Sequence, residues 1–112
     1  MTLIKYSIAN QFSRKPGPRY KEQGKNSGQE FLEDILLGIF DNAVNSGQIL
    51  QINLDYTYGY GPSFLEESFG GLSRRRDKEI ILKTLQFIST EEPYLIDEIK
   101  QYINEAKQLQ LV

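Results

Sequence analysis

The segment Ile49-Leu50-Gln51-Ile52-Asn53-Leu54-Asp55 lies near the middle of this 112-residue chain and is its most strand-like stretch. Its mostly apolar side chains are typical of a strand that is buried on both faces in the middle of a sheet. A glycine-rich turn with three tyrosines, residues 56–62, follows directly. The Ser63 hydroxyl would then cap a helix, Glu66 would complete the capping box, and Gly70-Gly71 would end or loosen that helix.

A second helix is predicted before this segment. Ser27 and Glu30 have the spacing of a capping box, and apolar residues from positions 31 to 43 recur every three or four residues. Gly47 can adopt the left-handed conformation that closes helices. The region therefore predicts an amphipathic helix that ends near residue 47.

The outer parts of the chain predict two more strands and a last helix. Residues 3–8 and 80–88 are rich in apolar, branched residues, which favour strands. Glycines and prolines within residues 10–26 indicate a long loop, in which Arg19-Tyr20-Lys21 could form a short strand. Pro93 opens a final helix.

The resulting order, β–loop–α–β–α–β–α, favours a single α/β domain over residues 1–112. We expect about four strands, largely parallel or mixed, flanked by helices. The expected core consists of apolar residues from all of these elements: Ile35, Ile39, Ile52, Leu54, Phe69, Leu82, Ile96, Ile99 and Ile103.

The composition excludes several kinds of chemistry. The chain has no cysteine and no histidine, which removes zinc fingers, iron–sulfur clusters, thiol nucleophiles and Ser-His dyads. We therefore expect no catalytic residues, metal or cofactor. No apolar run is long enough for a membrane span and no signal-peptide pattern opens the chain, so we expect a cytoplasmic protein without membrane contact.

Charge is distributed unevenly along the chain. Residues 1–26 carry six basic side chains against one acidic, whereas residues 27–72 carry seven acidic side chains and no basic one. The acidic middle could face a basic partner, or it could simply be the solvated side of two helices. A sequence pI near 5.2 makes nucleic-acid binding an unfavoured class.

The turn after the central strand is the candidate binding region, because ligands of α/β sheets bind beyond the carboxyl ends of the strands. It lacks the glycine spacing and the lysine of nucleotide-binding loops. The three tyrosines of the turn, at positions 56, 58 and 60, could form a contact surface, although one or more of them could pack into the core. The candidate partner-binding residues are Asp55, Tyr58, Tyr60, Phe64, Glu66 and Glu67.

Two blocks of the sequence resemble a known family. Ile52-Asn53-Leu54-Asp55 and the block from Gly59 to Leu72 are similar to the signature of the STAS-like family of unknown function. Phe12-Ser13-Arg14 with Pro16-Gly17-Pro18-Arg19, and Ser27-Gly28-Gln29-Glu30-Phe31, resemble its earlier blocks.

The resemblance implies a STAS-like fold without enzymatic activity. STAS domains include the bacterial anti-sigma factor antagonists, in which a serine at the start of a helix is phosphorylated by a histidine-kinase-like ATPase. Ser63 is the nearest equivalent, although Gly61-Pro62-Ser63-Phe64 departs from the usual Asp-Ser-Ser-Gly element. Ser63 is thus a candidate phospho-acceptor, and its alternative role is that of a helix cap alone.

Three functions therefore compete. The first is a regulatory protein-interaction module that binds a histidine-kinase-like ATPase or an anti-sigma-like factor, and that could also form a homodimer. The second is a nucleic-acid-binding accessory protein that uses the basic loop from Arg14 to Lys25 together with Arg74, Arg75 and Arg76. The third is a small enzyme that uses Asp55, Tyr60 and the Glu66 helix.

Overall fold

The structure is a computed structural model that describes residues 2–107. Three strands form one parallel sheet in the order β1-β2-β3: β1 (Leu3–Ser7), β2 (Ile49–Asn53) and β3 (Leu85–Ile88). The α-helices are α1 (Ile8–Gln11), α2 (Gly28–Phe31), α3 (Leu37–Ser46), α4 (Pro62–Leu65), α5 (Gly71–Arg75), α6 (Lys78–Thr84) and α7 (Tyr94–Glu105), and three further turns are η1 (Lys21–Gln23), η2 (Leu32–Leu36) and η3 (Glu66–Gly70).

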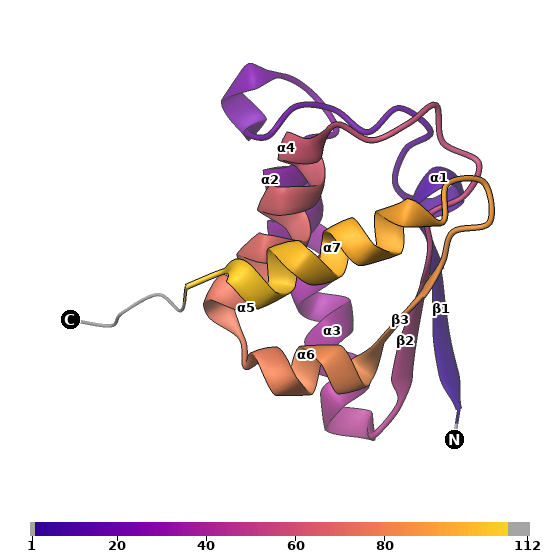
Figure 1. Cartoon of the computed structure of the whole chain (residues 1–112), viewed down its shortest axis with the longest axis vertical. Coiled ribbons are helices and arrows are strands. Elements are labelled where there is room, and N and C mark those ends of the chain that lie inside the picture. The colour runs from indigo at the N-terminus through magenta and orange to yellow at the C-terminus, as the bar shows by residue number, and fades with distance from the viewer. Residues whose placement is uncertain (1, 108–112) are drawn as a thin grey trace.

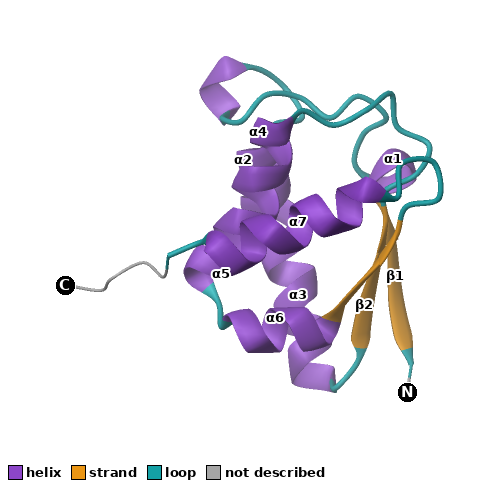
Figure 2. Cartoon of the chain, viewed as in Figure 1, coloured by secondary structure: helices purple, strands orange, loops and turns teal. Residues whose placement is uncertain are grey.

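The longer helices cover one face of the sheet, as Figures 1 and 2 show. In a parallel sheet with the order β1-β2-β3, two right-handed crossovers place their helices on the same side. The opposite face carries polar side chains, among which Gln51 Nε2 donates a hydrogen bond to Gln86 Oε1 at 2.7 Å. The prediction that the central strand is buried on both faces is therefore wrong, because only alternate residues of β2 are buried.

Two long helical segments pack over the sheet. The first runs through α2, η2 and α3, starts where Ser27 Oγ accepts a hydrogen bond from the Glu30 N–H at 2.9 Å, and ends at Gly47 with φ +67°. The second runs through α4, η3 and α5 and does not end at Gly70-Gly71, since a π-helical turn carries it on to Arg75.

These two segments approach closely at Gly28. A Cβ atom there would lie 2.6 Å from the Phe64 carbonyl oxygen, so that only glycine allows this spacing of the backbones. Ser68 Oγ donates to the Gly28 carbonyl oxygen at 3.3 Å across the same contact. The contact fixes α4 against α2, at the end of the molecule where the candidate turn lies.

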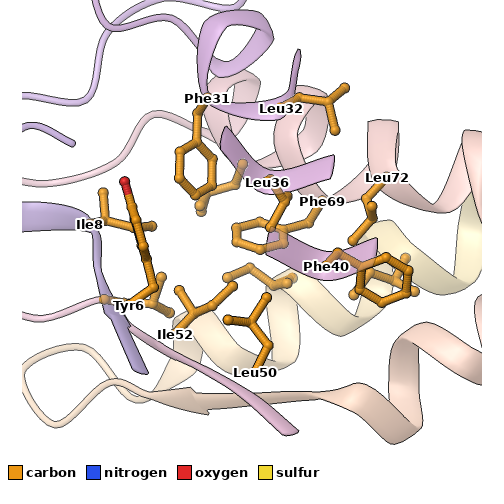
Figure 3. Close-up of a cluster of buried hydrophobic side chains, with 14 of the residues drawn as sticks. Tyr6, Ile8, Phe31, Leu32, Leu36, Phe40, Leu50, Ile52, Phe69 and Leu72 are labelled. Atoms are coloured by element: carbon orange, nitrogen blue, oxygen red, sulfur yellow. The ribbon is translucent and has the colours of Figure 1, made fainter. Parts of the chain in front are cut away.

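The core lies between the sheet and the two helical segments (Figure 3). Five predicted core residues, Ile52, Leu54, Phe69, Ile99 and Ile103, are buried. Ile35 and Ile39 are partly buried and pack against the core, and Ile96 is half-buried. Leu82 is 40% exposed, so its assignment to the core is wrong.

The error at Leu82 has a local cause. Residues 80–84 belong to helix α6, which starts where Asp77 Oδ1 accepts a hydrogen bond from the Ile80 N–H at 3.0 Å. The strand begins only at Leu85. Residues 19–21 form no strand, and the described residues contain three strands instead of the expected four.

Within residues 2–107, no helix has the length and apolar character needed to cross a membrane.

Candidate functional site

Three loops meet beyond the carboxyl ends of the strands, where Figure 2 shows the teal segments gathered. The loop after β2, residues 54–61, lies between the other two and is called the tyrosine turn below. The Tyr58 N–H donates to the Arg14 carbonyl oxygen at 2.8 Å, and the Tyr56 N–H donates to Glu91 Oε1 at 2.7 Å. The turn is thereby attached to the loops that follow β1 and β3.

Asp55 anchors the tyrosine turn to the loop after β3. Its side chain accepts hydrogen bonds from Thr90 Oγ1 at 2.6 Å, from the Thr90 N–H at 2.9 Å and from the Glu91 N–H at 3.0 Å. Burial alone would raise the pKa of the Asp55 carboxyl, but these hydrogen bonds outweigh it and hold the pKa below its ordinary value. Asp55 is only 3% exposed, so the structure places it beneath the candidate surface, as an internal anchor.

The backbone of the turn is held in an unusual conformation. Tyr56 has φ +73°, which is rare for a bulky residue and costs about 1–3 kcal/mol. Its N–H is held by Glu91, and the Gly59 N–H donates to Thr57 Oγ1 at 3.2 Å. Tyr56 and Tyr58 are both exposed on the turn that is held in this way.

The tyrosines of the turn divide into two kinds. Tyr58 is 78% exposed and Tyr56 is 58% exposed, and Lys15 Nζ lies 5.7 Å from the Tyr58 ring centroid. Tyr60 turns inward, donates its hydroxyl to the Leu54 carbonyl oxygen at 2.8 Å and packs against Phe64. Burial raises the pKa of the Tyr60 hydroxyl well above its usual range.

Ser63 is exposed at the second position of helix α4. Gly61 occupies the N-cap, and no side chain caps this helix. The predicted capping role of Ser63 and its capping box with Glu66 are therefore wrong, because the helix starts at Pro62, two residues earlier than expected. The Ser63 hydroxyl is left without a hydrogen bond to any residue in the described part of the chain.

Glu66 and Glu67 take part in a network with two arginines from distant segments. Arg19 Nη1 lies 2.5 Å from Glu66 Oε1 and 3.6 Å from Glu67 Oε1, and Arg74 Nη1 lies 2.6 Å from Glu66 Oε2. Burial would raise the pKa of the Glu66 carboxyl, but the hydrogen bonds from Arg74 and Arg19 lower it overall. The network ties the long loop to the second helical segment, so these two carboxylates already have partners within the chain.

Other basic residues also neutralise the acidic middle. Arg76 binds Asp41 with Nε and Nη2, both at 2.8 Å, and Lys21 contacts Glu33 at 3.1 Å. Arg75 Nη2 lies 3.6 Å from Glu33 Oε2. The arginine run and part of the basic loop are therefore engaged within the fold, which leaves less free positive charge for a nucleic acid than the sequence suggested.

The six predicted partner-binding residues thus separate in the structure. Tyr58 is at the surface, Tyr60 is partly buried, Asp55 and Phe64 are buried, and Glu66 and Glu67 are in ion pairs. The sequence analysis missed Thr90 and Arg19 as their partners, and no short-range pattern links positions so far apart. Among residues 2–107, no three acidic side chains gather as a metal site would require.

Residues 27–95 match the family model of the STAS-like domain of unknown function. No curated protein and no solved structure matches the chain.

Proposed function

The chain belongs to the family of STAS-like domains of unknown function, and from this premise we propose that it is a non-catalytic, regulatory protein-interaction module. Its contact surface is the tyrosine turn together with the exposed first turn of α4. The partner is a protein of the histidine-kinase-like ATPase or anti-sigma-like class, and Ser63 accepts the phosphate that controls binding.

The observation that carries the proposal is the exposure of Tyr58, 78%, on a turn whose backbone is fixed by the neighbouring loops. A tyrosine contributes a large contact area and loses little conformational freedom on binding, which is why it is enriched among the residues that dominate interface energies. Asp55 and Glu91 hold the turn before any partner arrives. Such a surface binds with little ordering cost.

The free hydroxyl of Ser63 supports its role as phospho-acceptor. Because the hydroxyl caps no helix, its modification would break no hydrogen bond within the described residues. A phosphate would add about −1.5 to −2 charge beside the helix N-terminus, where negative charge is stabilised, and would change the charge that a partner meets. Phosphorylation therefore alters the surface and preserves the fold.

A photo-crosslinking amino acid at position 58 tests the contact surface. We expect the cross-linker to capture a specific protein in cells, whereas the same group at exposed Asn42 on α3 captures none. The captured protein, once purified, should bind Tyr58→Ser at least about tenfold more weakly than wild type, a loss of about 1.4 kcal/mol. Equal binding of Tyr58→Ser would contradict the proposed surface.

The regulatory part is tested with the captured protein and ATP. We expect intact-mass analysis to detect one phosphate on the wild-type chain and none on Ser63→Ala. Ser63→Asp should retain the wild-type unfolding midpoint while its affinity for the captured protein changes. Phosphate on Ser63→Ala, or unchanged binding of Ser63→Asp, would remove Ser63 from the mechanism and leave the contact surface intact.

A further inference from the structure

The exposed surface around the tyrosine turn has a second property, which is its charge pattern. Tyr56, Tyr58 and Tyr94 are all more than half exposed. Two exposed basic residues, Arg14 and Lys15, lie beside Tyr58. The Arg14 carbonyl oxygen accepts a hydrogen bond from the Tyr58 N–H, and the Lys15 ammonium group contacts the tyrosine ring. One end of the surface is therefore basic.

The other end is acidic. Glu91 accepts the Tyr56 N–H, and neighbouring Glu92 accepts the hydroxyl of Tyr94. The carboxylates of Asp55, Glu92 and Glu91 also contribute to raising the pKa of Tyr60, which places their negative charge around the turn. None of Arg14, Lys15, Glu91 and Glu92 forms a salt bridge in the described part of the chain, in contrast to the arginine run.

We propose that this surface binds a second copy of the same chain. In a twofold-symmetric dimer the same patch meets itself, so the basic end of one copy faces the acidic end of the other and the tyrosines pack between them. The positive charges of Arg14 and Lys15 balance the negative charges of Glu91 and Glu92, so these four side chains do not make two copies repel one another. A polyanion such as nucleic acid would be attracted at one end and repelled at the other.

The inference goes beyond the proposed function, because self-association needs no partner. The dimer would hide Tyr58, and a partner that uses the same turn would have to displace the second copy. We expect a weak and reversible dimer, with a Kd between about 10 μM and 1 mM, as is typical of small transient interfaces.

Charge reversal tests the twofold arrangement by sedimentation equilibrium. Lys15→Glu gives the four charged side chains of the patch a net charge of −2, and Glu92→Lys gives them +2. Copies of either variant therefore repel one another, and each variant alone should dimerise at least about tenfold more weakly than wild type. An equimolar mixture of the two variants should restore dimerisation to within about threefold of wild type, since the opposite patches attract. Tyr58→Ser should also weaken the dimer at least about tenfold.

The matched control reverses charges on α6, at the other end of the sheet. Lys83→Glu, Glu79→Lys and their mixture should all dimerise as wild type does. Far-ultraviolet circular dichroism and thermal unfolding of each variant show whether it is folded. The proposal is overturned if the wild-type chain stays monomeric up to about 1 mM. It is also overturned if Lys15→Glu and Glu92→Lys leave the dimer unchanged. Neither result changes what the cross-linking experiment at position 58 says about a different partner.

Discussion

The hydroxyl of Tyr6 is buried and has no hydrogen-bond partner among residues 2–107. Figure 3 shows its oxygen close to the side chains of Ile8 and Phe31. A buried polar group without a partner costs about 1–3 kcal/mol, and phenylalanine fills the same space without the hydroxyl. We expect Tyr6→Phe to raise the free energy of unfolding by about 1 kcal/mol in urea titration. A loss of stability would show that a bound water satisfies the hydroxyl.

Asp55 contributes more to the fold than its sequence context suggests. Replacing it with asparagine removes a charge that accepts three hydrogen bonds from Thr90 and Glu91, so we expect a loss of about 1.5–3 kcal/mol at neutral pH. The pKa of Asp55 is lowered in the folded state. Its contribution is therefore complete above the unfolded pKa of about 3.9 and is lost as pH falls through the folded pKa.

Urea titrations of wild type and Asp55→Asn at several pH values measure this contribution. The difference between the two proteins should shrink steadily below about pH 4. A difference that stays constant down to pH 2 would show that the carboxylate charge has no part in anchoring the turn.

At the scale of elements, two glycines in the first helical segment form a matched pair. A Cβ at Gly28 would clash with the Phe64 carbonyl oxygen at 2.6 Å, whereas a Cβ at Gly38 has no atom within 4 Å. We expect Gly28→Ala to cost about 1–3 kcal/mol or more, because the backbone of α4 would have to move. Gly38→Ala should instead stabilise the helix by about 0.5–1 kcal/mol. Thermal unfolding separates the two, and equal effects would contradict the close contact of the helices.

Sequence patterns predicted the elements best where local signals agree. The helical segment from Gly28 to Ser46 is predicted by an N-cap serine, a regular apolar spacing and a terminal glycine, and the structure confirms all three. The capping box forms only in part, because the Glu30 side chain accepts the Asn26 N–H and not the Ser27 N–H. Helix α6 was predicted as a strand because Ile80, Ile81 and Leu82 are β-branched or apolar. The signal for a helix was present in Asp77, whose side chain caps it.

At the scale of the whole molecule, the sequence predicted where the candidate surface lies and not which residues reach it. The alternation of strands and helices placed the tyrosine turn at the carboxyl edge of the sheet, as observed. Exposure depends on contacts between distant segments, however, and these bury Asp55 under Thr90 and pair Glu66 with Arg19. Local spacing contains no information about such partners. Of the six candidate partner-binding residues, only Tyr58 is largely exposed.

The acidic middle of the chain is largely neutralised from within, which makes stability depend on pH. Hydrogen bonds from Lys21 lower the pKa of Glu33, and those from Arg76 lower the pKa of Asp41. Burial would raise the pKa of Glu66, but hydrogen bonds from Arg74 and Arg19 outweigh burial and lower it overall. Each carboxyl therefore has a lower pKa in the folded than in the unfolded state. Their contribution is complete above the unfolded pKa values and is lost as pH falls through the folded ones.

We accordingly expect the urea midpoint of the wild-type chain to fall continuously between about pH 5 and pH 2, because the unfolded chain binds more protons there. Glu66→Gln removes the carboxylate that joins Arg19 to Arg74, so this variant should be less stable at pH 7 and lose less on acidification. Glu79→Gln on α6 is the control, since Glu79 forms no ion pair within the described residues, and it should keep the wild-type slope. If the urea midpoints of Glu66→Gln and of the wild type fell by the same amount on acidification, the ion pairs of Glu66 would not be what holds the long loop against the second helical segment. The acid sensitivity would then have to come from Asp55, Asp41 and Glu33, which the same titration of Asp55→Asn and Asp41→Asn can separate.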